Sequence, residues 1–201
     1  MDLDDVFSIE LLDKIQTRNV NHVIDLTAVK KAMECAKLYH SHQERQSGEP
    51  YYSHSFEVAI KVLDYYFETD PIVAAIIHDV VEDSFFSISQ VGLIFNSNVK
   101  EIVNKLTKLD LNKKRKLSPE WTLHKLSQDK IATVIKLLDR MHNMQTIFYI
   151  KSETKRIRIA KETINIYVPL AQIMGLEDIK NELLSLSYKV LSNLSRSEFE
   201  S

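Results

Sequence analysis

Apolar residues recur at helical spacing along most of this 201-residue chain. Within 29–40, 56–66, 99–106, 131–141 and 179–194 they fall three and four positions apart, which places them on one face of a helix. Thr27 is expected to cap the first of these helices, and Pro71 to open the third helix. Ser87 and Gln90 predict a capping box, and one unbroken helix is expected over 152–173. The pattern predicts an all-α fold, organised as a single domain over residues 1–201.

The amino-acid composition supports the all-α prediction and reduces the number of function classes to consider. Three Gly and four Pro are too few for the many turns of a sandwich or barrel. A formal net charge of -2 gives no global basic field for nucleic acid, although Lys113–Lys116 predicts an exposed basic loop. Neither a signal peptide nor a membrane-length apolar run is evident, and the lone Cys35 suits a reducing compartment, so a cytoplasmic protein is expected.

The first candidate for chemistry is the pair His78-Asp79, which interrupts the apolar run 72–81. This run is interpreted as one buried helix, in which unsatisfied polar side chains would cost several kcal/mol each. Glu82 and Asp83 would lie one turn further on the same face, where a carboxylate can orient or deprotonate a metal-bound water. The alternative is a solvated polar helix end, and the dipeptide alone leaves the two readings about equal.

Two other segments complete the candidate site. Asp139, Asn143 and Thr146 form one helical stripe, and Asp139 is flanked by apolar residues. The alternative for Asp139 is an ion pair with Lys136 or Arg140. The other segment is the turn before His54, in which Arg45 and Ser47 are suited to hold a phosphorylated or planar group. Two His and two Asp without a thiolate point to Mn, Fe or Zn rather than Ca.

The order of these residues resembles the signature of the HD metal-dependent phosphohydrolases. More narrowly, the chain resembles the hydrolase domain of the RelA/SpoT alarmone family. The resemblance extends over residues 36–190 and rests on these stretches: His40-x-x-Gln43-x-Arg45-x-Ser47-Gly48-Glu49-Pro50-Tyr51 with His54, Ile76–Asp83, Leu106–Leu109, Ile135–Met144, Ala160–Thr163 and Tyr167–Ala171. Several motifs in register are far more specific than one.

The resemblance implies an HD domain that holds one Mn²⁺ and removes the 3′-pyrophosphate from guanosine tetra- or pentaphosphate (ppGpp or pppGpp). The products are GDP or GTP and pyrophosphate, so such an enzyme would control alarmone levels in the stringent response. By resemblance the roles are metal ligation for His54, His78, Asp79 and Asp139, water activation for Glu82 and Asp83, guanine contact for Arg45 and Ser47, and nucleoside contact for Asn143 and Thr146.

The resemblance is not complete. His42 stands in place of the usual Gly, Gln46 in place of a basic residue, and Ser55 in place of the Pro that commonly follows the histidine. No synthetase or regulatory domain is expected in the chain. Two alternatives stay open: an HD phosphatase acting on another phosphorylated nucleotide such as NADPH, and an antitoxin-like partner that neutralises a nucleotide or a synthetase. The sequence leaves open whether the protein forms a homo-oligomer.

Overall fold

The computed structural model describes residues 3–111 and 129–197, excluding the side chains of residues 83, 108–111 and 193–197. The chain divides into two compact units, residues 1–115 and 116–201, which are described separately. The predicted basic loop Lys113–Lys116 lies outside the described residues. Within the described ranges every regular element is helical, and the only extended pairing is an isolated bridge between Glu44 and Pro50, so the all-α prediction is confirmed.

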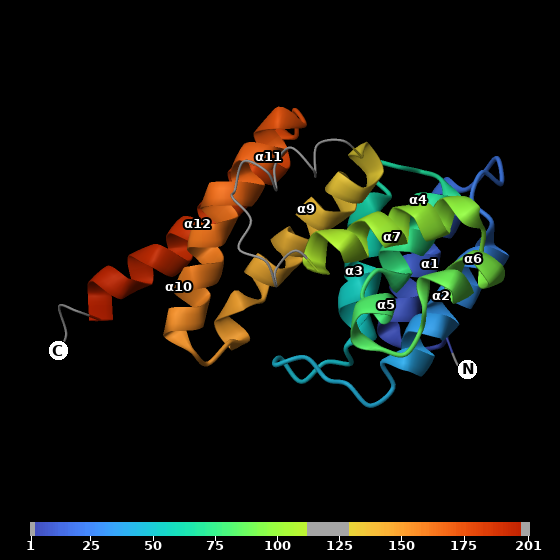
Figure 1. Cartoon of the computed structure of the whole chain (residues 1–201), viewed down its shortest axis with the longest axis horizontal. Coiled ribbons are helices and arrows are strands. Elements are labelled where there is room, and N and C mark those ends of the chain that lie inside the picture. The colour runs from blue at the N-terminus through green and yellow to red at the C-terminus, as the bar shows by residue number, and fades with distance from the viewer. Residues whose placement is uncertain (1–2, 112–128, 198–201) are drawn as a thin grey trace. The chain divides into compact units, whose positions relative to one another are not determined.

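The first unit is built around one apolar helix. Its elements are α1 (Val6–Arg18), α2 (Leu26–Tyr39), α3 (Tyr52–Val62), α4 (Thr69–Ile77), α5 (Val80–Asp83), α6 (Ile88–Ile94) and α7 (Ser97–Leu111). Every residue of α4 from Pro71 onward is buried, as expected for a helix that is apolar all round. Helices α2, α3 and α7 pack against it (Figure 1). The residues that directly follow α4 are therefore held in place by the core of this unit.

The helix caps of the first unit agree in part with those predicted from the sequence. The capping box of Ser87 and Gln90 at the start of α6 is confirmed. The cap of α2 is Asp25 rather than Thr27, because the Asp25 carboxylate accepts the backbone N–H groups of Thr27 and Ala28 and starts the helix earlier.

The predicted single helix through His78 and Asp79 is wrong in one respect: α4 ends at Ile77, and the two residues form a turn before the short α5. In a continuous helix the carbonyl of Ala75 would accept from the backbone N–H of Asp79. Here that oxygen lies 2.7 Å from Nδ1 of His78, so a side chain competes with the backbone at this point.

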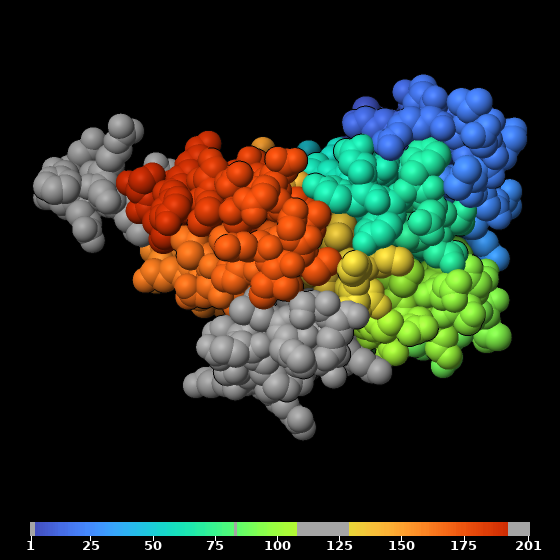
Figure 2. Space-filling model, turned by 90° about the horizontal axis from the view of Figure 1, so that it is seen from above, coloured from blue at the N-terminus to red at the C-terminus, as the bar shows by residue number. Residues whose placement is uncertain are grey.

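The second unit consists of α9 (Lys130–Gln145), the 3₁₀ turn η2 (Ile147–Tyr149), α10 (Glu153–Glu162), the π-helical turn η3 (Thr163–Tyr167), α11 (Val168–Ile173) and α12 (Glu177–Ser197). Helix α12 packs against α9, α10 and α11, and the atoms of α10 to α12 form one surface in Figure 2 (orange to red).

The predicted unbroken helix over 152–173 is interrupted by η3. The interruption precedes Pro169, whose ring has no N–H and would clash with the carbonyl four residues earlier in a regular α-helix, and a wider π turn accommodates it. Among the described residues, no helix combines the length and the apolar character that crossing a membrane requires. A single domain over residues 1–201 stays a prediction.

Candidate metal centre

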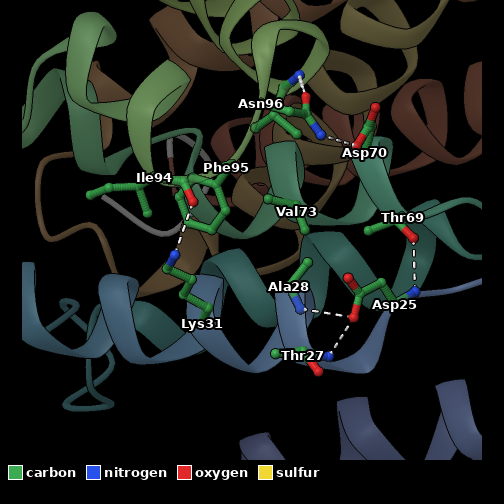
Figure 3. Close-up of a pocket in the computed structure, with 11 residues that line it drawn as sticks. Asp25, Thr27, Ala28, Lys31, Thr69, Asp70, Val73, Ile94, Phe95 and Asn96 are labelled. Carbon is green, nitrogen blue, oxygen red and sulfur yellow. Dashed lines mark hydrogen bonds between the residues drawn. The ribbon is translucent and has the colours of Figure 1, made fainter.

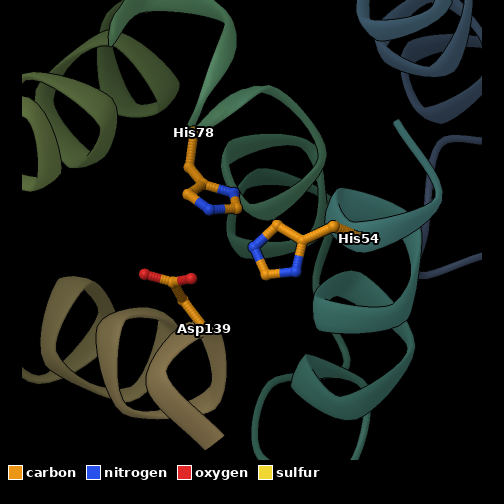
Figure 4. Close-up of side chains that lie close together, drawn as sticks. All are labelled: His54, His78 and Asp139. Carbon is orange, nitrogen blue, oxygen red and sulfur yellow. The ribbon is translucent and has the colours of Figure 1, made fainter. Parts of the chain in front are cut away.

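The packing of α3 against α4 brings two histidines together. His54 lies in the first turn of α3, and His78 follows the last residue of α4. Both side chains are buried, at 2% and 1% exposure, and their ring centroids are 5.6 Å apart. Figure 4 shows the two imidazoles turned toward a common space. Burial of two imidazoles in an apolar unit requires polar partners for their ring nitrogens.

Asp79 provides a carboxylate for both rings. One oxygen, Oδ1, lies 3.1 Å from Nε2 of His78, and the other, Oδ2, lies 3.7 Å from Nε2 of His54. The carboxylate therefore faces the same nitrogen of each ring. Two nitrogens and one carboxylate converge within the first unit, without any thiolate.

The tautomer of His78 is set by the end of α4. Nδ1 lies 2.7 Å from the carbonyl oxygen of Ala75, which can only accept, so Nδ1 carries a proton and donates it. The carbonyl is available because the last four carbonyls of a helix lack backbone partners. In the neutral ring Nε2 then carries a lone pair, and this lone pair faces the Asp79 carboxylate. Such an arrangement is favourable only with a shared cation, either a proton on Nε2 or a metal ion. The N and O donors fit a divalent transition metal, and the backbone bond is the kind that orients metal-ligating histidines.

Asp139 belongs to α9 in the second unit and is drawn with the histidines in Figure 4. It is 7% exposed. Oδ2 lies 3.0 Å from Nζ of Lys136, which is also buried, and Oδ1 accepts a 2.5 Å hydrogen bond from Nδ2 of Asn143. The ion pair with Lys136, considered from the sequence as an alternative to metal ligation, is therefore present.

The predicted catalytic pair follows the histidine–aspartate turn directly. Glu82 is half-buried on α5, and its backbone N–H donates to the carbonyl of Asp79 at 3.1 Å. The side chain of Asp83 lies outside what the structure describes. The next turn is fixed by Ser84, whose hydroxyl donates to the carbonyl of Val80 at 2.5 Å and accepts from the N–H of Phe86 at 3.1 Å.

Arg45 and Ser47, predicted to contact the guanine, are half-buried in the turn before α3. The N–H of Arg45 donates to the carbonyl of Glu49 at 2.9 Å, and the hydroxyl of Ser47 donates to the Glu49 carboxylate at 3.1 Å. Gly48 has φ of 89°, a left-handed conformation that other residues rarely adopt. The turn thus has a defined backbone that presents both side chains close to the start of α3.

The two residues predicted to contact the nucleoside make local bonds on α9. The Asn143 amide donates to Asp139, as described above, and the Thr146 hydroxyl donates to the carbonyl of His142 at 3.1 Å. Thr146 is the C-cap of the helix. Neither bond uses all the hydrogen-bonding capacity of these side chains.

Arg140, which follows Asp139 in the sequence, was not predicted as a functional residue, yet it contacts side chains of two other elements. Its guanidinium donates to the hydroxyl of Tyr167 at 2.9 Å, lies 4.0 Å from the centre of that ring and pairs with Glu162 at 3.4 Å. Burial alone would lower the pKa of Arg140, but Tyr167 and Glu162 outweigh it and the pKa is raised above its ordinary value. Arg140 therefore stays charged and ties α9 to α10 and η3. The motif stretches containing Glu162 and Tyr167 were the only sequence signal for this contact.

A separate pocket of about 280 Å³ lies at the N-terminal ends of α2 and α4 (Figure 3). Its polar groups are bonded to one another: Lys31 donates to the carbonyl of Ile94, and Asn96 donates to Asp70. It contains none of the predicted site residues and offers no convergent set of groups for chemistry.

A comparison with known protein families identifies the family of this chain. The HD domain family matches residues 32–177, which include the His54, His78-Asp79 and Asp139 positions. The chain belongs to the HD domain family. The family assignment made from the order of these residues is thereby confirmed.

Relatives of known name are similar to this HD domain over most of its length. A protein named GTP pyrophosphokinase rsh from Brucella ovis is 35% identical over 91% of this chain. Proteins named guanosine-3′,5′-bis(diphosphate) 3′-pyrophosphohydrolase are 39% identical over 78% of the chain in Haemophilus influenzae and 34% identical over 90% in Aquifex aeolicus. The chain spans about a quarter of the length of these relatives, at 25%, 24% and 26%.

A solved structure shares the fold. It is described as a metazoan ortholog of SpoT that hydrolyzes ppGpp, and it superposes with a TM-score of 0.65 over 81% of this chain and 94% of its own. At 20% sequence identity, this likeness concerns the fold of the HD domain.

Proposed function

We propose that this HD domain is a metal-dependent 3′-pyrophosphohydrolase of guanosine 3′,5′-bis(diphosphate) and its pentaphosphate analogue. Water would attack the 3′-pyrophosphate, and the products would be pyrophosphate with GDP or GTP. The similarity to proteins named for this reaction supports the substrate class, because it covers most of the chain.

The observation that carries the proposal is the convergence of His54, His78 and Asp79. A buried Nε2 lone pair facing a carboxylate, with the opposite ring nitrogen bonded to a backbone carbonyl, is the donor arrangement of a metal centre rather than of a passive core. Asp139, the only described aspartate of α9 and a member of the family motif, is proposed as the fourth ligand. Mn²⁺ is the proposed ion, since mixed imidazole and carboxylate donors suit it.

When bound, a divalent cation polarises phosphoryl oxygens and lowers the pKa of water. The chain itself would supply the remaining functions. Glu82 and Asp83 are proposed to orient the attacking water and accept its proton, a contribution typically worth 10²–10⁴-fold in rate. Arg45 and Ser47 are proposed to hold the guanine, and Asn143 and Thr146 the nucleoside. Because Ser47 already bonds Glu49, the turn is preorganised for this role.

The test is a product analysis of the purified protein, first stripped of metal and then supplied with Mn²⁺. Guanosine tetraphosphate and NADPH are offered separately, and the products are resolved by ion-exchange chromatography. We expect GDP and intact pyrophosphate from the tetraphosphate, and no turnover in EDTA. Orthophosphate from NADPH, with no product from the tetraphosphate, would overturn the proposed substrate. Turnover that persists in EDTA would overturn the metal dependence.

A further inference from the structure

The carboxylate of Asp139 is held at both oxygens by side chains of its own helix. Lys136 precedes it by three residues and Asn143 follows by four, so all three lie on one stripe of α9. Nζ of Lys136 is 3.0 Å from Oδ2, and Nδ2 of Asn143 is 2.5 Å from Oδ1. A carboxylate bound at one oxygen can still rotate about its Cβ–Cγ bond. A carboxylate whose two oxygens are bound from opposite ends of a helical stripe cannot rotate in this way.

The burial of this group makes the two contacts costly to lose. Lys136 is 5% exposed and Asp139 is 7% exposed. A buried carboxylate left without its partner is strongly destabilised, because the desolvation of the charge is no longer offset. A surface ion pair at the same spacing would contribute only a few tenths of a kcal/mol. Both partners of the pair are therefore buried, and the carboxylate is oriented by a contact at each oxygen.

We propose that Lys136 and Asn143 are positioning residues that preorganise Asp139 as a metal ligand. This inference rests on the proposed function, since it takes Asp139 as the fourth ligand. The amine and the amide each take one of the roughly four lone-pair sites of a carboxylate. Outer partners of this kind commonly change metal affinity by 10–100-fold when removed. The inference adds a second role for Asn143 to the nucleoside contact proposed above.

The test measures Mn²⁺ binding directly, from the electron paramagnetic resonance signal of the free ion, so it does not depend on turnover. Lys136→Met removes the charge with little change of length, and Asn143→Leu removes the amide with little change of volume. We expect each to raise the Mn²⁺ dissociation constant by about 10–100-fold. Lys136→Arg restores a donor and is expected to recover most of the affinity. Lys130→Met, at an exposed lysine of the same helix, is the matched control and is expected to bind as wild type.

Other outcomes overturn the inference in distinguishable ways. Asp139→Asn, measured in parallel, tests the ligand itself: if it binds Mn²⁺ as wild type does, both the ligand assignment and this inference fail. If Asp139→Asn weakens binding but Lys136→Met leaves it unchanged or tightens it, only the inference fails, because the lysine would then be a bystander or a competitor of the cation. An Asn143→Leu protein with a raised KM and unaltered Mn²⁺ affinity would overturn the positioning role of Asn143 and leave it nucleoside contact alone. Circular dichroism confirms that each variant is folded.

Discussion

Nδ1 of His78 donates to the carbonyl of Ala75 at 2.7 Å, and this one contact links the end of a buried helix to the chemistry of the site. It ends the regular hydrogen bonding of α4, fixes the ring tautomer and directs Nε2 toward Asp79. Because α4 is enclosed by three other helices, the ring has little freedom to move. A ligand fixed in this way loses little entropy when a cation binds.

Metal binding should therefore stabilise the folded protein. With the ion at about 100 times its dissociation constant, binding to the native state alone is worth about 2.7 kcal/mol. For a chain of this size we expect the Tm to rise by roughly 5–10 °C. The measurement is a thermal melt of the metal-free protein with and without Mn²⁺. His78→Ala should lose the shift, and an equal shift in that variant would exclude His78 as a ligand.

Glu82 is expected to be needed for turnover and not for folding. It is half-buried and does not belong to the buried core of the first unit. Glu82→Ala should lower kcat by about 10²–10⁴-fold while the melting curve and Mn²⁺ affinity stay close to wild type. Glu101→Ala, at an exposed glutamate on α7, is the control and should retain activity. If Glu82→Ala protects cells from a toxic synthetase as well as wild type does, the antitoxin-like alternative would be favoured over the enzymatic proposal.

Features that depend only on the order and spacing of side chains could be predicted from the sequence. The apolar run before His78 predicted a buried helix because a helix that is apolar all round has no polar face to expose to water. The capping box of Ser87 and Gln90 was correct because both of its bonds come from residues at a fixed spacing. The family of the chain was predictable for the same reason, since the residues of its motifs keep their order along the chain.

Features that depend on backbone atoms or on packing could not be predicted. The carbonyl of Ala75 has no sequence signal of its own, so neither the turn at His78 nor its tautomer could be anticipated. The contact of Arg140 with Tyr167 joins residues 27 positions apart and appears only when α9 packs near η3. The pair of Lys136 and Asp139 was foreseen, but as an alternative to metal ligation, because spacing alone cannot show that both side chains are buried.

Cys35 should be unreactive in the folded protein. Burial raises the pKa of its thiol to about 11, and only the thiolate is nucleophilic. At pH 8 roughly one thiol in a thousand is then ionised, so we expect alkylation by iodoacetamide to be slower by about two orders of magnitude than for a free cysteine. Labelling followed by mass spectrometry in buffer and in 6 M guanidinium provides the comparison. Rapid stoichiometric labelling in buffer would contradict the raised pKa of this thiol.

The ion pair at the start of α1 should make the stability of the first unit depend on pH. Lys37, 5% exposed on α2, pairs with Asp5, the N-cap of α1. Burial alone would raise the pKa of Asp5, but the hydrogen bonds from Lys37 and Ser8 outweigh it and the pKa is lowered. A lowered pKa in the folded state stabilises the protein above the unfolded-state value of about 3.9, and this contribution is lost as the pH falls through the folded-state value.

Asp5→Asn removes the charge that gives this dependence and leaves Lys37 without its carboxylate. At pH 7 we expect it to lower the free energy of unfolding by roughly 1–3 kcal/mol, between the cost of a lost cap and that of a broken buried pair. Urea unfolding of both proteins at pH 7 and pH 3 measures the difference, which should shrink at the lower pH because Asp5 of the unfolded wild-type chain then binds a proton that folding must release. Glu10→Gln, in the exposed pair with Lys14, is the matched control and should change stability by no more than about 0.5 kcal/mol. A difference between Asp5→Asn and wild type that is the same at both pH values would show that the cap, and not the charge of Asp5, holds α1 in place.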